Sequence, residues 1–306
     1  MSRRRRTPPT PVTGLVAVLA AALLLAGCGG QGEHGKAAAN THKDGGRPSA
    51  SAPAHDTSGW DPHPDTIAAV GDSITRAFNA CRALADCPSA SWSTGEGRKV
   101  DSLARRLPDR DHKGEDTWNL AQDGAVVAQL PEQMRQAARH RPELVTVLIG
   151  ANDACRPHVS AMTSVDDFRT RFSEALRTLR SDAPHAEVYV ASVPDLKRLW
   201  EAGKGHKEAR QVWSLGICQS MLADPQDTGP QATARRDQVR ERVKEYNDVL
   251  RQVCARDRRC RYDDGAVFGY RLTPADLSDW DWFHPSKRGQ NGLADLAYRH
   301  ITEAGD

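Results

Sequence analysis

The stretch TIAAVGDSITRAF, residues 66–78, joins a short apolar run to an abrupt polar turn. Residues 66–70 are almost continuously apolar, which is typical of a strand buried on both faces of a parallel sheet. The run ends at Gly71-Asp72-Ser73. All three residue types are common in turns, so Ser73 is either an ordinary turn residue or a nucleophile held at the tip of a strand.

Further apolar runs alternate with segments of helical period. The runs predict strands at residues 144–149 and 187–192, and more weakly at 117–120 and 260–264. Apolar residues recur every three or four positions within 127–138, 165–179 and 239–253, and Ser164 and Asp167 form a capping signature ahead of the second of these. This alternation predicts one three-layer α/β domain, a parallel sheet with helices on both faces.

Polar residues and glycine follow the predicted strands at one edge of this sheet. Ser73 follows the first run, Gly124 follows residues 117–120, and Asn152 follows residues 144–149. Active sites of such sheets lie at the carboxyl ends of the strands. Near the end of the chain, Asp281 precedes His284 by three residues, a spacing that lets a carboxylate reach one ring nitrogen. Taken alone, the pair is weak evidence, and a surface-loop histidine is the favoured interpretation.

Four segments together are more specific. AVGDSIT, NLAQDGA, VLIGAND and DWFHPSKRG occur in the order and approximate spacing of the sequence blocks of SGNH, or GDSL, hydrolases. The chain resembles this family over residues 66 to about 298. The resemblance implies the SGNH hydrolase fold, whose parallel sheet is flavodoxin-like, and an ester hydrolase that uses no metal or other cofactor.

The resemblance also implies a role for each matching residue. Ser73 is the nucleophile and donates its backbone N–H to the oxyanion, together with the Gly124 N–H and the Asn152 side-chain amide. His284 is the general base and then the acid, and Asp281 fixes its tautomer. The neighbouring acids Asp72 and Asp153 are expected to brace loops. Residues 122–123, Gln-Asp, depart from the small residues usual in the second block and place a negative group near the oxyanion region or on a solvated turn.

A finer likeness points to the phospholipase-B-like branch. The segments SWSTGEG (91–97), PEQMRQ (131–136) and GANDAC (150–155) resemble stretches of that branch. A cysteine recurs there shortly after the Gly-x-Asn-Asp block, which suits an oxidised Cys155.

The first 59 residues indicate export and tethering. Four arginines precede an apolar run at 14–27 that is too short to span a bilayer, so residues 1–27 are interpreted as a signal peptide, with twin-arginine export left open. Leu25-Ala26-Gly27-Cys28 resembles the lipobox of bacterial lipoproteins, which predicts lipidation of Cys28; ordinary cleavage near Ala26 is the alternative. Residues 28–59 are predicted to be a flexible, lipid-anchored linker and 60–306 the hydrolase domain. The linker histidines fit a solvated segment better than a metal site: His34, His42 and His55.

Cysteine usage agrees with export. Without Cys28, six cysteines remain, and an even number in an exported chain favours disulfides. Six cysteines allow fifteen pairings. Two pairs lie six residues apart, so the simplest set is Cys81–Cys87, Cys254–Cys260 and, by remainder, Cys155–Cys218. A zinc site is the alternative, but no CxxC spacing occurs.

Charge and composition limit the kinds of binding partner and substrate that the sequence suggests. With 42 basic and 40 acidic residues the net charge is only +2, which gives no indication of a nucleic-acid partner. We expect an extracytoplasmic, membrane-tethered monomer that hydrolyses a lipid ester or an acylated glycan through an acyl-enzyme. A carbohydrate or other acyl-group deacetylase and a non-catalytic binding lipoprotein are the alternatives. Trp282 and Phe283 are favoured for the pocket edge, and four tryptophans could line an acyl or sugar site or fill the core: Trp200, Trp213, Trp280 and Trp282.

Overall fold

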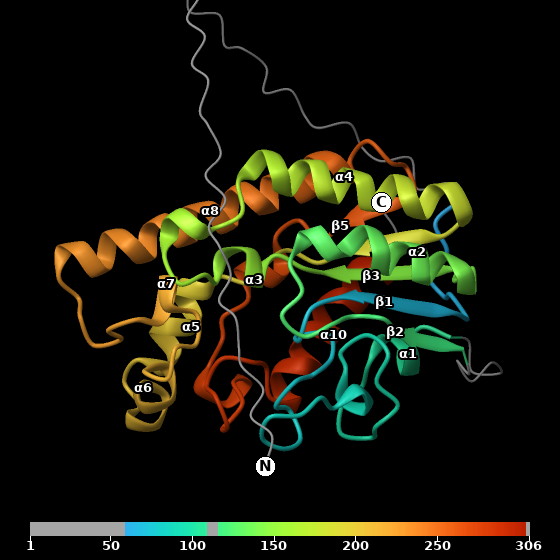
Figure 1. The fold of residues 1–306 in the computed structure, drawn as a ribbon. Helices are drawn as coiled ribbons and strands as arrows, with labels where there is room; N and C mark the ends of the chain where they lie inside the picture. Colours follow the sequence, from blue (N-terminus) through green and yellow to red (C-terminus); the bar gives the residue numbers. More distant parts are fainter. Residues whose placement is uncertain (1–58, 109–115, 304–306) are drawn as a thin grey trace, which may run out of the picture. The chain divides into compact units, whose positions relative to one another are not determined.

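The first predicted strand, β1 (Ile67–Gly71), lies within a five-stranded parallel sheet (Figure 1). The computed structural model describes residues 59–108 and 116–303. The strand order is β2-β1-β3-β4-β5, and every neighbouring pair is parallel. This order is that of flavodoxin-like sheets and confirms the predicted α/β fold. The other strands are β2 (Thr117–Asn119), β3 (Leu144–Leu148), β4 (Glu187–Val190) and β5 (Cys260–Tyr262).

Helices cover both faces of the sheet (Figure 1). One face carries α2 (Leu130–His140), α4 (Val165–Asp182) and α8 (Pro230–Cys254), and the other carries α1 (Leu103–Arg106) and α10 (Lys287–Thr302). The predicted cap of α4 is present, because Ser164 Oγ accepts the N–H of Asp167 at 3.1 Å. The predicted helix at 127–138 is divided, with a 3-10 turn (Val127–Gln129) before α2, whose first turn contains Pro131.

Three helices that the sequence analysis did not predict follow β4: α5 (Leu196–Gly203), α6 (Lys207–Trp213) and α7 (Gln219–Leu222). They lie beyond the carboxyl ends of the strands, on the side of α3 (Ala151–Ala154), which follows β3 (Figure 1). Ser220 at the start of α7 donates its backbone N–H to Arg156 O at 2.8 Å. These helices therefore build a wall beside the edge of the sheet at which Ser73, Gly124 and Asn152 are expected.

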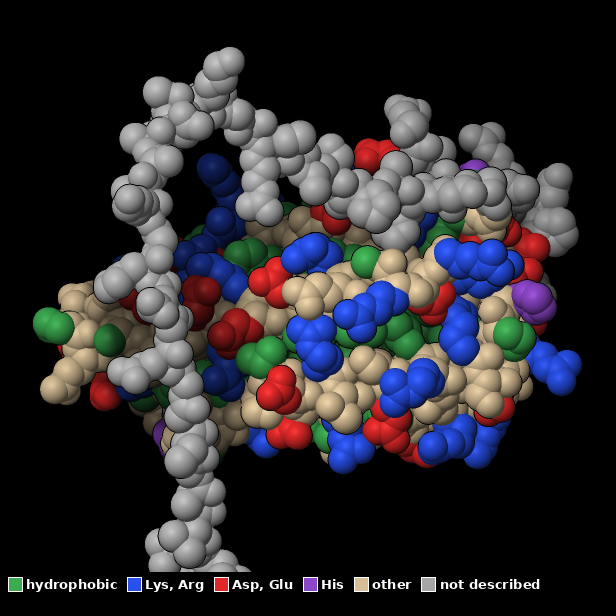
Figure 2. Space-filling view, turned by 90° about the horizontal axis from the view of Figure 1, so that it is seen from above, with side chains coloured by type: hydrophobic (Ala, Val, Ile, Leu, Met, Phe, Trp, Pro, Cys, Tyr) green, Lys and Arg blue, Asp and Glu red, His purple; other side chains and the backbone are tan. Residues whose placement is uncertain are grey.

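The face covered by α4 and α8 carries basic and acidic side chains that are interspersed (Figure 2). Ion pairs within these helices include Arg171 with Glu174 and Arg242 with Glu245, both at 2.9 Å. Within the described parts of the chain, no helix combines the length and the apolar character that crossing a membrane requires. The predicted signal peptide, the lipidation of Cys28 and the three linker histidines lie outside the described residues.

Three disulfide bonds join the pairs that the sequence predicts: Cys81–Cys87, Cys155–Cys218 and Cys254–Cys260. The second of them closes a separation of 63 residues and ties α7 to the segment that follows α3. A constraint on so long a loop stabilises the folded chain by roughly 4 kcal/mol in the chain-entropy model.

Candidate active site

The turn after β1 is shaped by Gly71. Its φ is +141°, and a Cβ atom at this position would lie 2.1 Å from the carbonyl oxygen of Leu148 in β3, so only glycine fits. The side chain of Gln133 bonds both backbone groups of Gly71, accepting from its N–H at 2.7 Å and donating to its carbonyl at 2.9 Å. These contacts fix the end of the strand, and Ser73 follows two residues later.

A chain of hydrogen bonds joins Ser73 to His284 and Asp281. The distance from Ser73 Oγ to His284 Nε2 is 2.8 Å, and that from His284 Nδ1 to Asp281 Oδ2 is 2.6 Å. The serine and the histidine are separated by 211 positions in the sequence. Ser73 is only 7% exposed, so its hydroxyl is held in a partly desolvated setting. The structure thus brings together the three residues that the sequence singled out.

The carboxylate of Asp281 is held on both oxygens. Its Oδ1 accepts the backbone N–H groups of Phe283 at 2.9 Å and His284 at 3.0 Å. Burial acts to raise the pKa of Asp281, but the hydrogen bond and charge of His284, together with the Asn79 amide, outweigh it and hold the pKa below its ordinary value. Asp281 therefore stays ionised beside the imidazole.

Asn79 is a residue of this site that the sequence analysis missed. Its Nδ2 donates to Asp281 Oδ2 at 2.5 Å, while its Oδ1 accepts the N–H of Leu84 at 2.6 Å and its carbonyl accepts from Ser278 Oγ at 2.7 Å. Its φ of +59° is a left-handed conformation that asparagine tolerates better than most residues. The only signal in the sequence is an asparagine in the loop that leads to Cys81, and that signal is weak.

Gly124 and Asn152 line the same cleft as Ser73. Gly124 has a φ of +70°. Apart from its two chain neighbours, no described residue has an atom within 4 Å of the position that a Cβ would take, so the backbone there is open to a ligand. Asn152 donates one amide N–H to the carbonyl of Ala125 at 3.0 Å. Because an amide carries two N–H donors, this contact orients the side chain and leaves a second donor.

The two acids expected to brace loops do so. Asp72 Oδ1 accepts the N–H of Ile74 at 2.9 Å, while its buried Oδ2 has no partner among the described residues. Burial raises the pKa of Asp72 to about 7. Asp153 accepts the Val127 N–H at 2.9 Å and the Thr163 hydroxyl at 2.7 Å, and burial raises its pKa as well.

The cleft at the serine encloses about 690 Å³. The disulfide Cys155–Cys218 forms part of its wall, and the carboxylate of Asp123 lies on it next to Gly124. Burial and the neighbouring carboxylate of Asp86 raise the pKa of Asp123 to about 6. In the described part of the chain, no lysine or arginine lines this cleft. Apart from the histidine, its titratable side chains are therefore the carboxyl groups of Asp123 and Asp281.

Of the four candidate tryptophans, only Trp280 lines the cleft. Trp200 and Trp213 are buried in the core. The prediction that Trp282 forms the pocket edge is wrong, because its ring stacks on His206 with the centroids 4.5 Å apart, whereas Phe283 does line the cleft. The backbone at Trp282 is left-handed, with a φ of +54°, so the side chains around it do not alternate in direction as they would in an extended segment.

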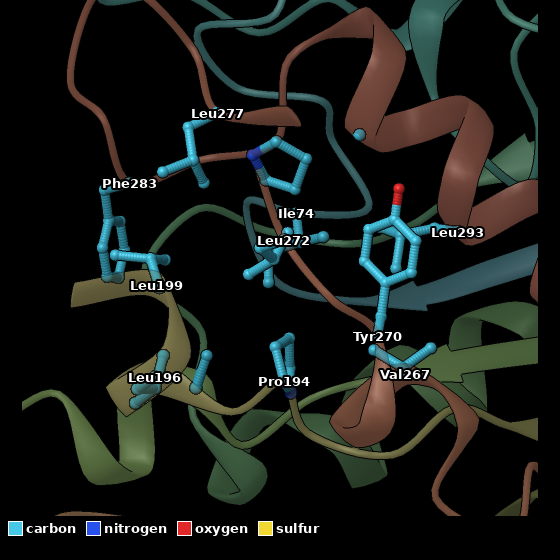
Figure 3. Close-up of a pocket in the computed structure, with 13 residues that line it drawn as sticks. Ile74, Pro194, Leu196, Leu199, Val267, Tyr270, Leu272, Leu277, Phe283 and Leu293 are labelled. Atoms are coloured by element: carbon cyan, nitrogen blue, oxygen red, sulfur yellow. The ribbon is translucent and has the colours of Figure 1, made fainter. Parts of the chain in front are cut away.

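Behind Phe283 lies a second, small cavity of about 40 Å³ with an almost wholly apolar lining (Figure 3). Phe283 lines both spaces, and Ile74, which follows Ser73 directly, lines the small one. Leu199 and Leu277 lie near the phenylalanine, while Leu293 lies across the space (Figure 3). The ring of Phe283 therefore stands between the cleft and an apolar cavity that adjoins the serine turn.

The fold and the hydrogen-bonded residues define a class: an α/β protein with the serine–histidine–aspartate arrangement of serine hydrolases. A family model described as GDSL-like Lipase/Acylhydrolase matches residues 69–291. The chain therefore belongs to the GDSL-like lipase/acylhydrolase family.

Several solved structures are similar to this chain. An extracellular lipase from Streptomyces rimosus is 18% identical, with 77% of this chain and 99% of that chain covered and a TM-score of 0.47. Phospholipase A1 from Streptomyces albidoflavus is 18% identical, with 79% and 99% covered and a TM-score of 0.46. A family 3 carbohydrate esterase from Clostridium thermocellum is 16% identical, with 77% and 94% covered and a TM-score of 0.42. No protein with a curated description matches the chain.

Proposed function

We propose that the chain is a carboxylic ester hydrolase in which Ser73 is the nucleophile. The observation that carries this proposal is the unbroken hydrogen-bond chain from Ser73 Oγ through His284 to Asp281. As Oγ attacks the ester carbonyl, Nε2 of His284 takes the serine proton and Asp281 stabilises the imidazolium that forms. The carbonyl oxygen becomes an oxyanion within reach of the Ser73 and Gly124 N–H groups and the free amide N–H of Asn152.

The imidazolium then gives its proton to the leaving alcohol, the C–O bond breaks and the acyl group stays on Ser73. In the second half, His284 takes a proton from water, whose oxygen attacks the acyl carbon. The proton returns to Oγ, and the carboxylic acid leaves. A protonated His284 can accept no proton, so activity falls on acidification.

The lining of the cleft favours an ester with hydrocarbon character. Phe78, Ile217 and Trp280 line it, and no basic side chain of the described residues does. We therefore place a lipid-type ester ahead of an acetylated glycan, in agreement with the phospholipase-B-like motifs. A deacetylase uses the same three residues and is the second candidate. Export, the lipid anchor on Cys28 and the monomeric state remain predictions from the sequence.

A substrate panel tests the proposal. p-Nitrophenyl esters of increasing chain length, a phosphatidylcholine and an acetylated glycan are offered to the wild-type chain and to Ser73→Ala and His284→Ala. Each variant should lose activity by roughly 10⁴-fold or more while its thermal unfolding stays unchanged. Activity retained above about 1% in either variant would refute the assigned roles. Hydrolysis of the glycan alone would favour the deacetylase, and no turnover of any ester would favour a binding protein.

A further inference from the structure

Three large apolar side chains are mostly exposed among the described residues, and all three lie around the mouth of the cleft. Leu84 is 85% exposed, Leu215 is 82% exposed and Trp280 is 55% exposed, and each of them lines the space in front of Ser73. One exposed leucine on a protein surface needs no explanation. Three that line one opening form a shared feature, which we call the apolar rim (Leu84, Leu215 and Trp280).

The apolar rim is assembled from three separate segments, each held by specific contacts. Leu84 lies in the loop closed by the disulfide Cys81–Cys87 and donates its N–H to Asn79 Oδ1 at 2.6 Å. Leu215 follows α6 and donates its N–H to the carbonyl of Val212 at 3.1 Å. Trp280 donates its N–H to Ser278 Oγ at 3.2 Å. The fold thus fixes the backbone under each exposed side chain.

The backbone of Leu84 also has a conformation that leucine rarely adopts. Its φ is +51°, a left-handed conformation that is unfavourable for a leucine. The contact with Asn79 links this position to the residue that bonds Asp281. A large apolar side chain is therefore presented to solvent on a strained, anchored loop beside the catalytic residues.

We propose that the apolar rim docks on a lipid surface. This inference rests on the proposed ester hydrolysis for its choice of occupant. A lipid surface covers the rim and at the same time supplies an ester to the cleft, whereas a second copy of the chain or another protein seated there would close the opening above Ser73. Tryptophan is suited to the polar–apolar boundary of a bilayer, and exposed leucines insert below it.

The charges around the cleft specify the kind of surface. The acidic Asp123 lines it, and within the described residues no lysine or arginine does. That carboxylate repels an anionic surface, while the exposed Arg82, two residues before Leu84, attracts one, so the opening carries little net charge. The rim therefore fits a neutral or zwitterionic surface such as phosphatidylcholine, with binding that depends on apolar insertion and little on ionic strength.

Quenching of Trp280 by brominated lipid tests this directly. The full chain carrying Ser73→Ala, so that it turns nothing over, is mixed with phosphatidylcholine vesicles brominated on the acyl chains. The same chain with Trp280→Phe gives the emission of the other six of the seven tryptophans. The difference in emission between the two chains is the contribution of Trp280, and the brominated lipid should quench that emission. Because this signal reports where Trp280 lies, an N-terminal anchor that only tethers the chain cannot produce it.

Leu84→Gln with Leu215→Gln should weaken the quenching of Trp280 about tenfold or more, since each leucine side chain loses its burial in lipid. The matched control, Arg171→Gln with Lys244→Gln on α4 and α8, should leave the quenching unchanged. Absence of a Trp280 signal, or no effect of the leucine changes, would overturn the proposal. So would emission of Trp280 that shifts with protein concentration in the absence of lipid, which indicates a second copy on the rim. Since the readout needs no turnover, failed ester hydrolysis by the parent chain would refute the proposed function separately.

Discussion

The side-chain amide of Asn79 and the imidazole of His284 contact the same oxygen of Asp281, at 2.5 and 2.6 Å. The carboxylate thus accepts two side-chain donors on Oδ2 and two backbone donors on Oδ1. Such a carboxylate cannot rotate without breaking several bonds. Asn79 is therefore a positioning residue, which acts on the reaction through Asp281 and does not touch the substrate itself.

Asn79→Asp separates this role from loop support. The aspartate keeps an oxygen for the N–H of Leu84, but it replaces the donor to Asp281 by a second carboxylate, which raises the pKa of Asp281. We expect kcat to fall by about 10²-fold with KM little changed and the acid limb of the pH profile to move to higher pH. Asn79→Ala should lose kcat as well. If Asn79 only holds the loop, the aspartate variant will behave like the wild type in both readouts.

Asp72 should make stability depend on pH. Burial raises its pKa from 3.8 to about 7, so the folded chain holds this proton at pH values where the unfolded chain has released it. Stability from this group is therefore fully present below about pH 4 and is lost as the pH rises through 7. Asp72→Asn removes the dependence. The difference in free energy of unfolding, variant minus wild type, should grow by roughly 2–3 kcal/mol between pH 5 and pH 8.

Denaturant unfolding at several pH values measures this difference, with the exposed Asp166→Asn as the control, which should show a flat difference. A flat profile for Asp72→Asn as well would mean that the buried carboxyl of Asp72 is ionised throughout this pH range in the folded chain, contrary to the raised pKa.

Phe283 should limit the length of the acyl chain. Its ring lies between the cleft and the apolar cavity of about 40 Å³, which has room for about three water-sized groups. Phe283→Ala joins the two spaces, and each further methylene that is buried contributes about 0.8 kcal/mol. The ratio of kcat/KM for p-nitrophenyl octanoate to that for the acetate should rise about tenfold or more. The Phe283 ring packs edge-on against the His284 ring with the centroids 5.1 Å apart, and a ratio of two esters cancels any general loss of activity caused by removing that contact.

Refilling the cavity provides the matching control. Leu272 lines the small cavity and is only half-buried, so Leu272→Phe in the Phe283→Ala background should return the ratio toward the wild-type value. An unchanged ratio in Phe283→Ala would show that the alkyl chain takes another direction.

Asp123 should select against anionic esters. With a pKa of about 6 it is negative at neutral pH. Arg76 acts to lower this pKa without outweighing burial and Asp86, and no lysine or arginine among the described residues lines the cleft itself. Asp123→Asn should raise kcat/KM for an ester that carries a carboxylate about threefold relative to its neutral analogue, a modest change because solvent screens an exposed group. In the wild type the discrimination should fade below about pH 6, as the carboxyl takes up its proton. Asp101→Asn, at an exposed position, is the control and should leave the selectivity unchanged. Equal discrimination between the two esters in the wild type and in Asp123→Asn would show that the charge of Asp123 does not determine the selectivity.

Whether a feature could be predicted from the sequence depends on how far apart in the chain its interacting residues lie. Ser73, Gly124 and Asn152 could be placed at one edge because buried parallel strands have a strong local pattern and their carboxyl ends must align. The missed contact of Asn79 with Asp281 joins residues 202 positions apart and depends on a left-handed turn that leaves almost no mark in the sequence. Trp282 was misplaced for a related reason, since its stacking on His206 involves an unpredicted helical segment.

The central claim is that Ser73 is a nucleophile activated by His284. A fluorophosphonate probe measures this directly, because it forms a covalent bond only with a serine oxygen whose proton is taken up. We expect one adduct, located by peptide mass spectrometry on Ser73, absent in Ser73→Ala and formed at least about 10²-fold more slowly in His284→Ala. An unlabelled Ser73 in the folded wild-type chain, or labelling at the same rate without the histidine, would contradict the account.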